Sequence, residues 1–262
     1  MEIMYIANEG FLIKASNKKI LIDALFGNFE SDWCDVPSGD MVERMETGTE
    51  PFDQIDVILI SHAHIDHFNA EIVSRHLESN PAGILVCPRQ VVQELERNTR
   101  YEKFGARVKE ITPEYEIGSE TIDVKGMGIK VWRLNHSPYY IENEETKQKY
   151  NKHENVQNLG FTIEIDHERI FHGGDWGYDG TGANTNPLEG EKIDLAFLSV
   201  EAYLRLYDAD NKEIDKSKKP NKIVLMHLYP PGDLEDLTED EKNTISETTV
   251  FKSRMEIKSF SD

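Results

Sequence analysis

The sequence predicts an α/β or α+β domain in which strands and helices pack in layers. Short apolar runs typical of buried strands alternate along the chain with segments of helical composition. At 262 residues, the chain matches the size of one α/β domain and is long enough to bury a large core. No linker or low-complexity segment interrupts it, so we expect a single domain over residues 1–262.

The first half is predicted to begin with strands. Alternating apolar residues over 3–13, followed by 19–23, predict a β-hairpin with its turn at Ser16 and Asn17. The Gly and Pro content of 27–53 indicates a loop, with a short helix near 41–45. Further elements are expected as strands over 56–60, 83–87, 108–111, 121–124 and 129–134 and as helices over 69–78 and 90–97.

The second half repeats this pattern. Residues 159–165 and 169–172 predict another hairpin, with its turn at Asp166 and His167. Buried strands are expected over 195–200, with Glu201 and Tyr203 at its end, and over 223–226. From Thr238 onward, the polar composition predicts one helix and a short tail.

Composition limits the partners of the protein. A formal net charge of −20 disfavours binding to nucleic acid, because such a surface repels phosphates. Two lysine clusters, Lys147/Lys149/Lys152 and Lys216/Lys218/Lys219, lie among acidic residues and indicate solvated mixed-charge loops. We therefore expect a small-molecule substrate and no nucleic-acid partner.

The sequence also argues against a membrane or disulfide-rich protein. No apolar run approaches the roughly 18 residues that a membrane span needs, and no signal-peptide pattern is present. Cys34 and Cys87 are far apart and belong to no metal-ligand cluster. We expect a cytoplasmic protein that does not bind membranes and in which both cysteines are ordinary residues.

One segment carries metal-binding chemistry. Ser61-His62-Ala63-His64-Ile65-Asp66-His67 follows a buried strand and precedes a helix. Imidazole and carboxylate groups are ligands for zinc and related first-row ions. His62 and His64 can face one ion, and Asp66 and His67 can face another. Two ions need more ligands than this segment supplies.

Further ligand types follow other predicted strands. His136 comes after 131–134, Asp175 after 170–172 in a Gly-Gly-Asp turn, and His227 after 223–226. Each lies at or just beyond the carboxyl end of a strand, where side chains from separate strands can converge on one crevice. The sequence therefore predicts a centre for two metal ions.

These residues resemble the metallo-β-lactamase superfamily. The segment from His62 to His67 matches its H-x-H-x-D-H motif, and His136, Asp175 and His227 match the later motifs in order and spacing. Asp23, at the end of the second predicted strand, matches the early Asp motif. The resemblance covers residues 5–229 and implies a four-layer αββα sandwich with two similar halves.

The resemblance also implies the role of each residue. His62, His64 and His136 would hold one ion, Asp66, His67 and His227 would hold the other, and Asp175 would bridge both. Asp23 would orient the motif histidines from behind, and His172 is a weaker candidate for that role. The cofactors would be two divalent ions, zinc or manganese, with iron as an alternative. Asp66, Asp175 and His227 are the expected catalytic residues.

Departures from the family motifs disfavour several branches of the superfamily. Many metallo-β-lactamases have Cys where this chain has Asp175, and glyoxalase II members have a different segment around His136. The nuclease members need an RNA-binding surface that a −20 chain does not predict. The chain is most similar to the ascorbate-phosphate lactonase and related metal-dependent hydrolases.

The expected reaction is hydrolysis of a small anionic ester, lactone or phosphodiester by a hydroxide that bridges the two ions. A non-hydrolytic iron-binding redox or sensor module on the same fold is the alternative. Loop aromatics are candidates for substrate contacts, as is Glu201. The aromatic candidates are Trp176, Tyr178 and Tyr139, together with Phe26, Trp33, Tyr140 and Tyr203.

Overall fold

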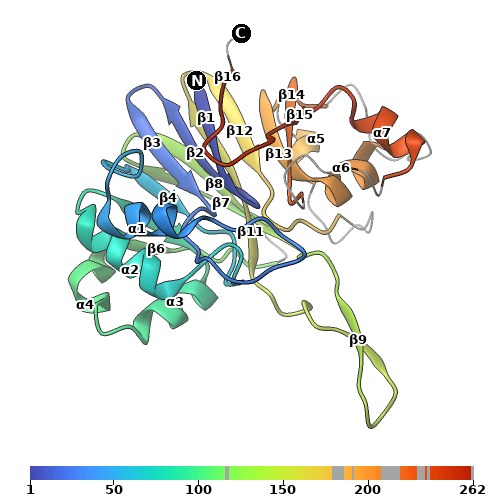
Figure 1. Cartoon of the computed structure of the whole chain (residues 1–262), viewed down its shortest axis with the longest axis horizontal. Helices are drawn as coiled ribbons and strands as arrows, with labels where there is room; N and C mark the ends of the chain where they lie inside the picture. Colours follow the sequence, from blue (N-terminus) through green and yellow to red (C-terminus); the bar gives the residue numbers. More distant parts are fainter. Residues whose placement is uncertain are drawn as a thin grey trace.

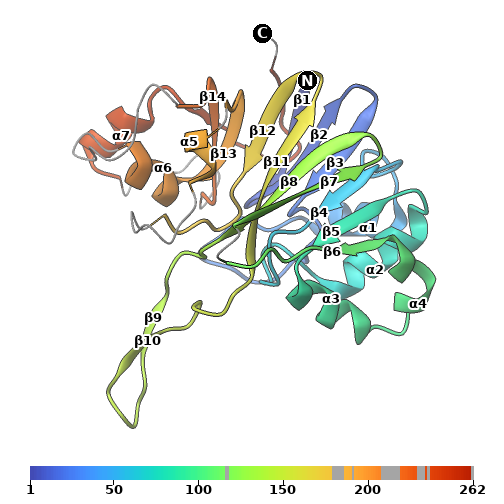
Figure 2. The same cartoon turned by 180° about the vertical axis from the view of Figure 1, so that it is seen from behind.

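A computed structural model places most of the chain in two mixed β-sheets that pack face to face (Figures 1 and 2). It describes residues 1–115, 118–178, 186–190, 192–207, 219–228, 234 and 237–260. Within these residues, each main sheet contains seven strands. Helices cover the outer face of each sheet, which confirms the predicted four-layer αββα sandwich.

The first sheet has the order β16-β1-β2-β3-β4-β5-β6, with antiparallel pairing up to β3 and parallel pairing from β3 to β6. Its strands are β1 (Glu2–Ala7), β2 (Gly10–Ala15), β3 (Lys18–Ile22), β4 (Val57–Leu59), β5 (Ile84–Cys87), β6 (Val108–Glu110) and β16 (Ile257–Ser259). Its helices are α1 (Gly39–Thr47), α2 (Ala70–Ser79), α3 (Arg89–Glu96) and α4 (Tyr101–Phe104), followed by a 3₁₀ turn over Gly105–Arg107.

The second sheet has the order β15-β14-β13-β12-β11-β8-β7. Its strands β12, β13, β14 and β15 pair in parallel. Its strands are β7 (Ser119–Val124), β8 (Met127–Leu134), β11 (Asn158–Ile165), β12 (Glu168–His172), β13 (Leu195–Ser199), β14 (Lys222–Met226) and β15 (Thr249–Val250). Helices α5 (Pro187–Gly190), α6 (Val200–Tyr207) and α7 (Glu239–Ile245) lie beside it.

A two-stranded arm projects from the sandwich (Figure 1). It consists of β9 (Tyr140–Glu142) and β10 (Lys149–Asn151), which pair antiparallel. The arm lies between β8 and β11 in the chain, so its base is close to the strand end that precedes His136.

Alternation along the strands builds the layers. In β1, Ile3 and Tyr5 face the core between the two sheets, whereas Met4 and Ile6 face the helices. A strand that is buried on both faces is apolar at every position, which explains the continuous apolar runs. Both predicted hairpins are confirmed: Ser16, Asn17, Asp166 and His167 all have positive φ, as tight turns with the twist of the strands require.

Three sequence predictions need correction. The run over 3–13 is two strands, because Asn8 adopts a φ of 50° and turns the chain between β1 and β2. Glu201 and Tyr203 do not end a strand: β13 stops at Ser199, and α6 begins at Val200. The C-terminal segment is not one helix and a tail, because β15 and β16 follow α7 and extend the two sheets.

Two other expectations concern the cysteines and membrane-spanning helices. Cys34 and Cys87 are both buried free thiols. Among the residues that the structure describes, none of the helices combines the length and apolarity that a membrane span requires.

A buried histidine joins two helices of the first layer. His76 of α2 donates from Nδ1 to the carbonyl oxygen of Met45 in α1, at 2.7 Å, and its Nε2 lies 3.3 Å from Nδ2 of Asn80. Burial lowers the pKa of His76 from 6.5 to about 4. The folded protein therefore holds this imidazole neutral at pH values where the unfolded chain binds a proton.

This histidine should make the metal-free protein sensitive to acid. The neutral imidazole of His76 contributes fully to the unfolding free energy above pH 6.5. This contribution is lost as the pH falls towards about 4, and the total loss is at most about 3 kcal/mol. We expect His76→Asn to lose less unfolding free energy than the wild type between these pH values in urea titrations. His167→Asn, in an exposed hairpin turn, is the control and should keep the wild-type slope. Equal slopes for His76→Asn and the wild type would contradict this prediction.

Candidate metal centre

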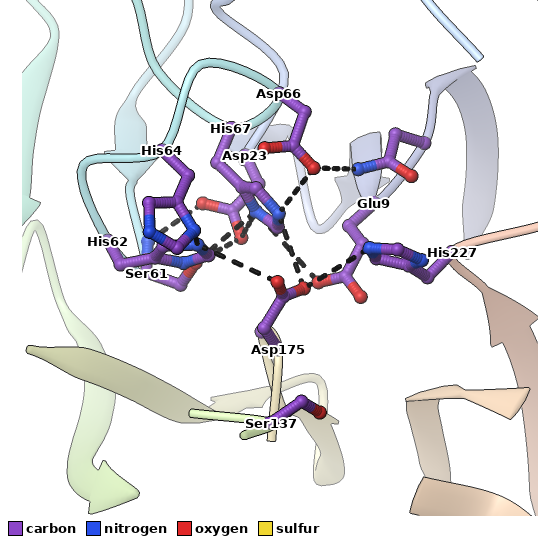
Figure 3. Close-up of polar contacts among 12 residues, drawn as sticks. Glu9, Asp23, Ser61, His62, His64, Asp66, His67, Ser137, Asp175 and His227 are labelled. Carbon is purple, nitrogen blue, oxygen red and sulfur yellow. Dashed lines mark hydrogen bonds and ion pairs between the residues drawn. The ribbon is translucent and has the colours of Figure 1, made fainter. Parts of the chain in front are cut away.

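Strand ends from both sheets bring the predicted ligands together (Figure 3). The segment Ser61 to His67 follows β4 in the first sheet, and His136, Asp175 and His227 follow β8, β12 and β14 in the second. His227 has a φ of 57°, so the chain turns sharply where β14 ends. The ligands therefore meet where the two sheets approach each other at one edge.

Gly174 allows the Gly-Gly-Asp turn to pack against the His62 segment. It has a φ of +54°, and a Cβ atom there would lie 2.6 Å from Oδ1 of Asn158 and 2.7 Å from Cβ of Ser61. Any side chain would push Asp175 away from the histidines, so the glycine sets the distance between the two sheets at the site.

Three imidazoles form the first ligand group. Nδ1 of His64 lies 3.0 Å from Nε2 of His62 and 3.1 Å from Nε2 of His136. Oδ2 of Asp175 completes the group, at 3.0 Å from Nε2 of His136 and 3.8 Å from Nε2 of His62. Ligands at zinc-to-nitrogen distances of about 2.05 Å in a tetrahedron are roughly 3.3 Å apart, so the spacing suits one such ion.

The tautomers of this group also fit a cation. Ser61 donates to Asp23, so Nδ1–H of His62 donates to Ser61 Oγ at 2.9 Å, and Nε2 of His62 keeps a lone pair. Nδ1–H of His136 donates to the carbonyl oxygen of Ser137 at 2.8 Å, which leaves a lone pair on its Nε2. One proton on His64 cannot satisfy both facing lone pairs. The arrangement therefore suits a metal ion better than hydrogen bonds among the rings.

Burial keeps two of these imidazoles neutral. It lowers the pKa of His62 well below the usual range, and the nearby His67 lowers it further. Burial and the neighbouring His136 lower the pKa of His64 to about 4. Only neutral imidazole binds a metal, so both rings can act as ligands at neutral pH without first losing a proton.

The second ligand group is richer in carboxylates. Nε2 of His67 lies 3.3 Å from Oδ2 of Asp66 and 3.3 Å from Oδ1 of Asp175. Nε2 of His227 lies 3.8 Å from the same Asp175 oxygen. Nε2 of His67 and Oδ1 of Asp175 are both buried, and neither makes a hydrogen bond. Such buried polar atoms are costly unless another group binds them.

Electrostatics in this group favour a cation. Burial would lower the pKa of His67, but Asp66 and Asp175 raise it well above the usual range. Burial would raise the pKa of Asp175, but His67 and His227 hold it well below its usual value. The surroundings of His67 are therefore negative, and a bound divalent ion would balance these carboxylates.

Asp23 supports both groups from behind. Its carboxylate is fully buried and accepts hydrogen bonds from the backbone N–H of Ser61 at 2.7 Å and from Ser61 Oγ at 2.6 Å. It also accepts from Nδ1–H of His67 at 3.1 Å, which directs Nε2 of that ring into the site. Carboxylate–histidine pairs of this kind fix ring orientation in metal sites.

Several site residues were not predicted from the sequence. Asn8 donates to Oδ2 of Asp66 at 2.9 Å. Glu9 is fully buried beside Asp175 and His67, and burial followed by repulsion from Asp175 raises its pKa. Both residues lie in the short turn between β1 and β2, where polar residues are ordinary, so nothing in the sequence marks them. His172 holds this turn in place by donating from Nε2 to the carbonyl oxygen of Glu9 at 3.0 Å.

His153 is another unpredicted neighbour. It follows the arm, and its ring centroid lies 4.2 Å from that of His136 and 4.8 Å from that of His64. Its Nδ1–H donates to the carbonyl oxygen of Ser137 at 3.0 Å. The segment around it is polar and loop-like in sequence, so only the folded arm reveals that this imidazole borders the site.

A cavity of about 490 Å³ opens over both ligand groups. Of the aromatics proposed to contact substrate, Tyr139 and Trp33 line it. Both are about half exposed, and Lys152 and Ile65 lie beside them on the cavity wall.

The other proposed substrate contacts lie elsewhere. Trp176 and Tyr178 are buried in the core beside the second sheet, and Phe26 is fully buried in the first half. Glu201 is on the exposed side of α6, where it pairs with Arg205 at 2.7 Å. Tyr203 is buried and donates to the carbonyl oxygen of Thr244 at 3.1 Å. None of these five lines the cavity over the ligands.

Comparison with protein families agrees with this geometry. Residues 18–211 match the model of a family described as the β-lactamase superfamily domain. This range includes Asp23, the His62–His67 segment, His136 and Asp175, whereas His227 lies beyond it. No curated protein sequence matches the chain.

Several solved structures share the fold at low sequence identity. A metallo hydrolase, Igni18 of Ignicoccus hospitalis, is 16% identical with a TM-score of 0.61, and the alignment covers 99% of both chains. The metallo-β-lactamase fold protein YhfI of Bacillus subtilis is 13% identical with a TM-score of 0.61, over 98% of this chain and 99% of that one. Human tRNase Z, short form, is 14% identical with a TM-score of 0.56 over 100% of both chains.

The position of Asp175 leads to a test by paired substitutions. Asp175→Ala removes a candidate ligand from both groups, whereas His227→Ala leaves His62, His64, His136 and Asp175 intact. We therefore expect Asp175→Ala to retain fewer ions per chain than His227→Ala after identical reconstitution. Elemental analysis of both variants, with circular dichroism to confirm folding, would measure this. Wild-type metal content in folded Asp175→Ala would show that Asp175 does not bridge two ions.

Proposed function

Because the chain belongs to the β-lactamase superfamily domain family, a family of metal-dependent hydrolases, we propose that it hydrolyses a small anionic ester, lactone or phosphodiester with two divalent ions. One observation carries this proposal: the two oxygens of Asp175 face separate ligand groups. Oδ2 is 3.0 Å from His136, and Oδ1 is 3.3 Å from His67. A buried carboxylate between two sets of nitrogen ligands is suited to hold two cations close together.

The two ligand groups would hold separate ions. His62, His64 and His136 would hold one ion and Asp66, His67 and His227 the other, with Asp175 shared between them. When bound, such ions lower the pKa of water to about 7 and polarise a carbonyl or phosphoryl oxygen. Asn8 holds Asp66 in place through its 2.9 Å hydrogen bond, and Asp23 fixes the ring of His67. These contacts would keep the ligands oriented throughout the reaction.

The charge of the site supports an anionic substrate. Two divalent ions would bring four positive charges, Asp66 and Asp175 would return two negative ones, and a bound hydroxide would return a third, so about one positive charge would remain among the ligands. Lys152 on the cavity wall adds another positive group. The chain as a whole carries −20, so this crevice would be a local attractor for small anions on an acidic protein. Its volume of about 490 Å³ suits a small molecule.

We expect the metal-replete protein to hold about two first-row ions per chain and to hydrolyse members of a panel of aryl esters, lactones and aryl phosphodiesters. Zinc and manganese are the ions to test first, followed by iron. Asp175→Ala should lose at least about a hundredfold in kcat/KM on any substrate found. Elemental analysis and initial-rate assays would test both expectations. Two bound ions with no turnover of any panel member would contradict the hydrolase proposal and favour the iron redox or sensor alternative.

We further expect no tight binding to nucleic acid at physiological salt, because a net charge of −20 repels phosphates. A gel-shift titration with random-sequence RNA should show no complex below micromolar protein. Complex formation in the nanomolar range would support a nuclease function instead. The catalytically inactive Asp175→Ala variant should be included so that RNA cleavage does not hide binding.

A further inference from the structure

A second cavity adjoins the one above the ligands. It has a volume of about 510 Å³ and lies between the end of β8 and the base of the arm. His136, Pro138 and His153 line both cavities, so the two form neighbouring chambers separated by these side chains. The second cavity therefore lies directly beside the candidate ligand His136.

Arg133 of β8 lines this second cavity. Its Nη1 is buried and makes no hydrogen bond, and the guanidinium forms no ion pair within the described part of the chain. Arg133 is half-buried, and this partial burial lowers its pKa. A charge that is partly removed from water and has no partner is costly, so its position beside a cavity points to a ligand that supplies the partner.

The other lining groups suit a polar ligand with one negative charge. Asn135, Asn151 and Tyr140 offer amide and hydroxyl groups. Arg205 also lines the cavity, but its guanidinium binds Glu201 at 2.7 Å. Glu154 also lines the cavity, but it is exposed, whereas Arg133 is half-buried. Arg133 is therefore the lining cation that is partly removed from water, and a guanidinium matches the two oxygens of a carboxylate in a bidentate pair.

We propose that Arg133 and its cavity bind a carboxylate of the substrate that lies apart from the bond to be hydrolysed. This inference rests on the proposed hydrolase function and specifies its substrate class as esters or lactones that carry a free carboxylate. A phosphate monoester is disfavoured, because its charge of about −2 would exceed the single positive charge of Arg133. Arg133 touches the substrate but not the reacting atoms, so it determines specificity.

Matched acids test this proposal without requiring turnover. Succinate, glutarate and adipate would be titrated calorimetrically into the metal-replete full chain, alongside butanoate, pentanoate and hexanoate. Each pair has the same number of carbons and differs by one carboxylate. We expect at least one diacid to bind the wild type roughly ten- to hundredfold more tightly than its monoacid, as a charge-assisted hydrogen-bonded pair provides.

Three variants locate the effect. Arg133→Gln should abolish the preference for the diacid, and Arg133→Lys should retain part of it, because lysine keeps the charge but not the fork of donors. Lys125→Gln is the control: it removes one positive charge at the opposite end of the β7–β8 hairpin, where Lys125 pairs with Asp56 at 3.1 Å. It should behave as the wild type. All variants should retain wild-type metal content.

The outcomes separate this proposal from the hydrolase proposal. A wild type without preference for any diacid, or a preference that persists in Arg133→Gln, would overturn the carboxylate site. Tighter, Arg133-dependent binding of 3-phosphonopropanoate than of glutarate would overturn the choice of carboxylate over phosphate. The 4-nitrophenyl monoesters of the diacids and of the monoacids report hydrolysis separately. Arg133-dependent binding without hydrolysis of any ester supports the site and counts against the hydrolase alone.

Discussion

The buried carboxylate of Asp23 is the contact on which the ligand arrangement depends. A fully buried carboxylate is stable only when hydrogen bonds replace its water, and Asp23 has three such donors at 2.6 to 3.1 Å. Each donor belongs to the segment that carries the histidines. The bonds that satisfy Asp23 are therefore the same bonds that fix Ser61 and the rings of His62 and His67.

The structure extends this support to the second sheet. His172 of β12 donates to the backbone of Glu9, and the N–H of Gly174 donates to Nδ1 of the same imidazole at 3.2 Å. His172 thus ties the turn after β1 to the turn that presents Asp175. Through Asp23 on one side and His172 on the other, the site joins both sheets. Its geometry depends on the packing of the whole sandwich rather than on any one loop.

The apolar runs predicted a layered α/β domain with candidate ligands at the strand ends, whereas the four-layer arrangement was implied by the resemblance of the His62–His67 segment to the metallo-β-lactamase superfamily. Strands of this sandwich are buried on both faces, so they appear as apolar runs, and the ligands follow directly at their ends. Glu9 and His153 could not be predicted in this way. Each is a polar residue in a turn or loop, and its proximity to the site arises from pairing between distant segments. The β15 and β16 strands were missed for the same reason, because short polar strands are defined by their partners.

The residues proposed to contact substrate were predicted least well, and the physical cause is different. Loop aromatics such as Trp176 and Tyr178 can line a cavity or complete a core, and here burial of their large apolar area placed them in the core. Arg133 gave no signal, because a charged residue near a strand end is ordinary in sequence. Its importance appears only when folding buries Nη1 beside a cavity without a partner. Metal ligands are recognisable because a cation requires particular atoms at a common point, whereas substrate contacts require only a complementary surface, which many residue types can provide.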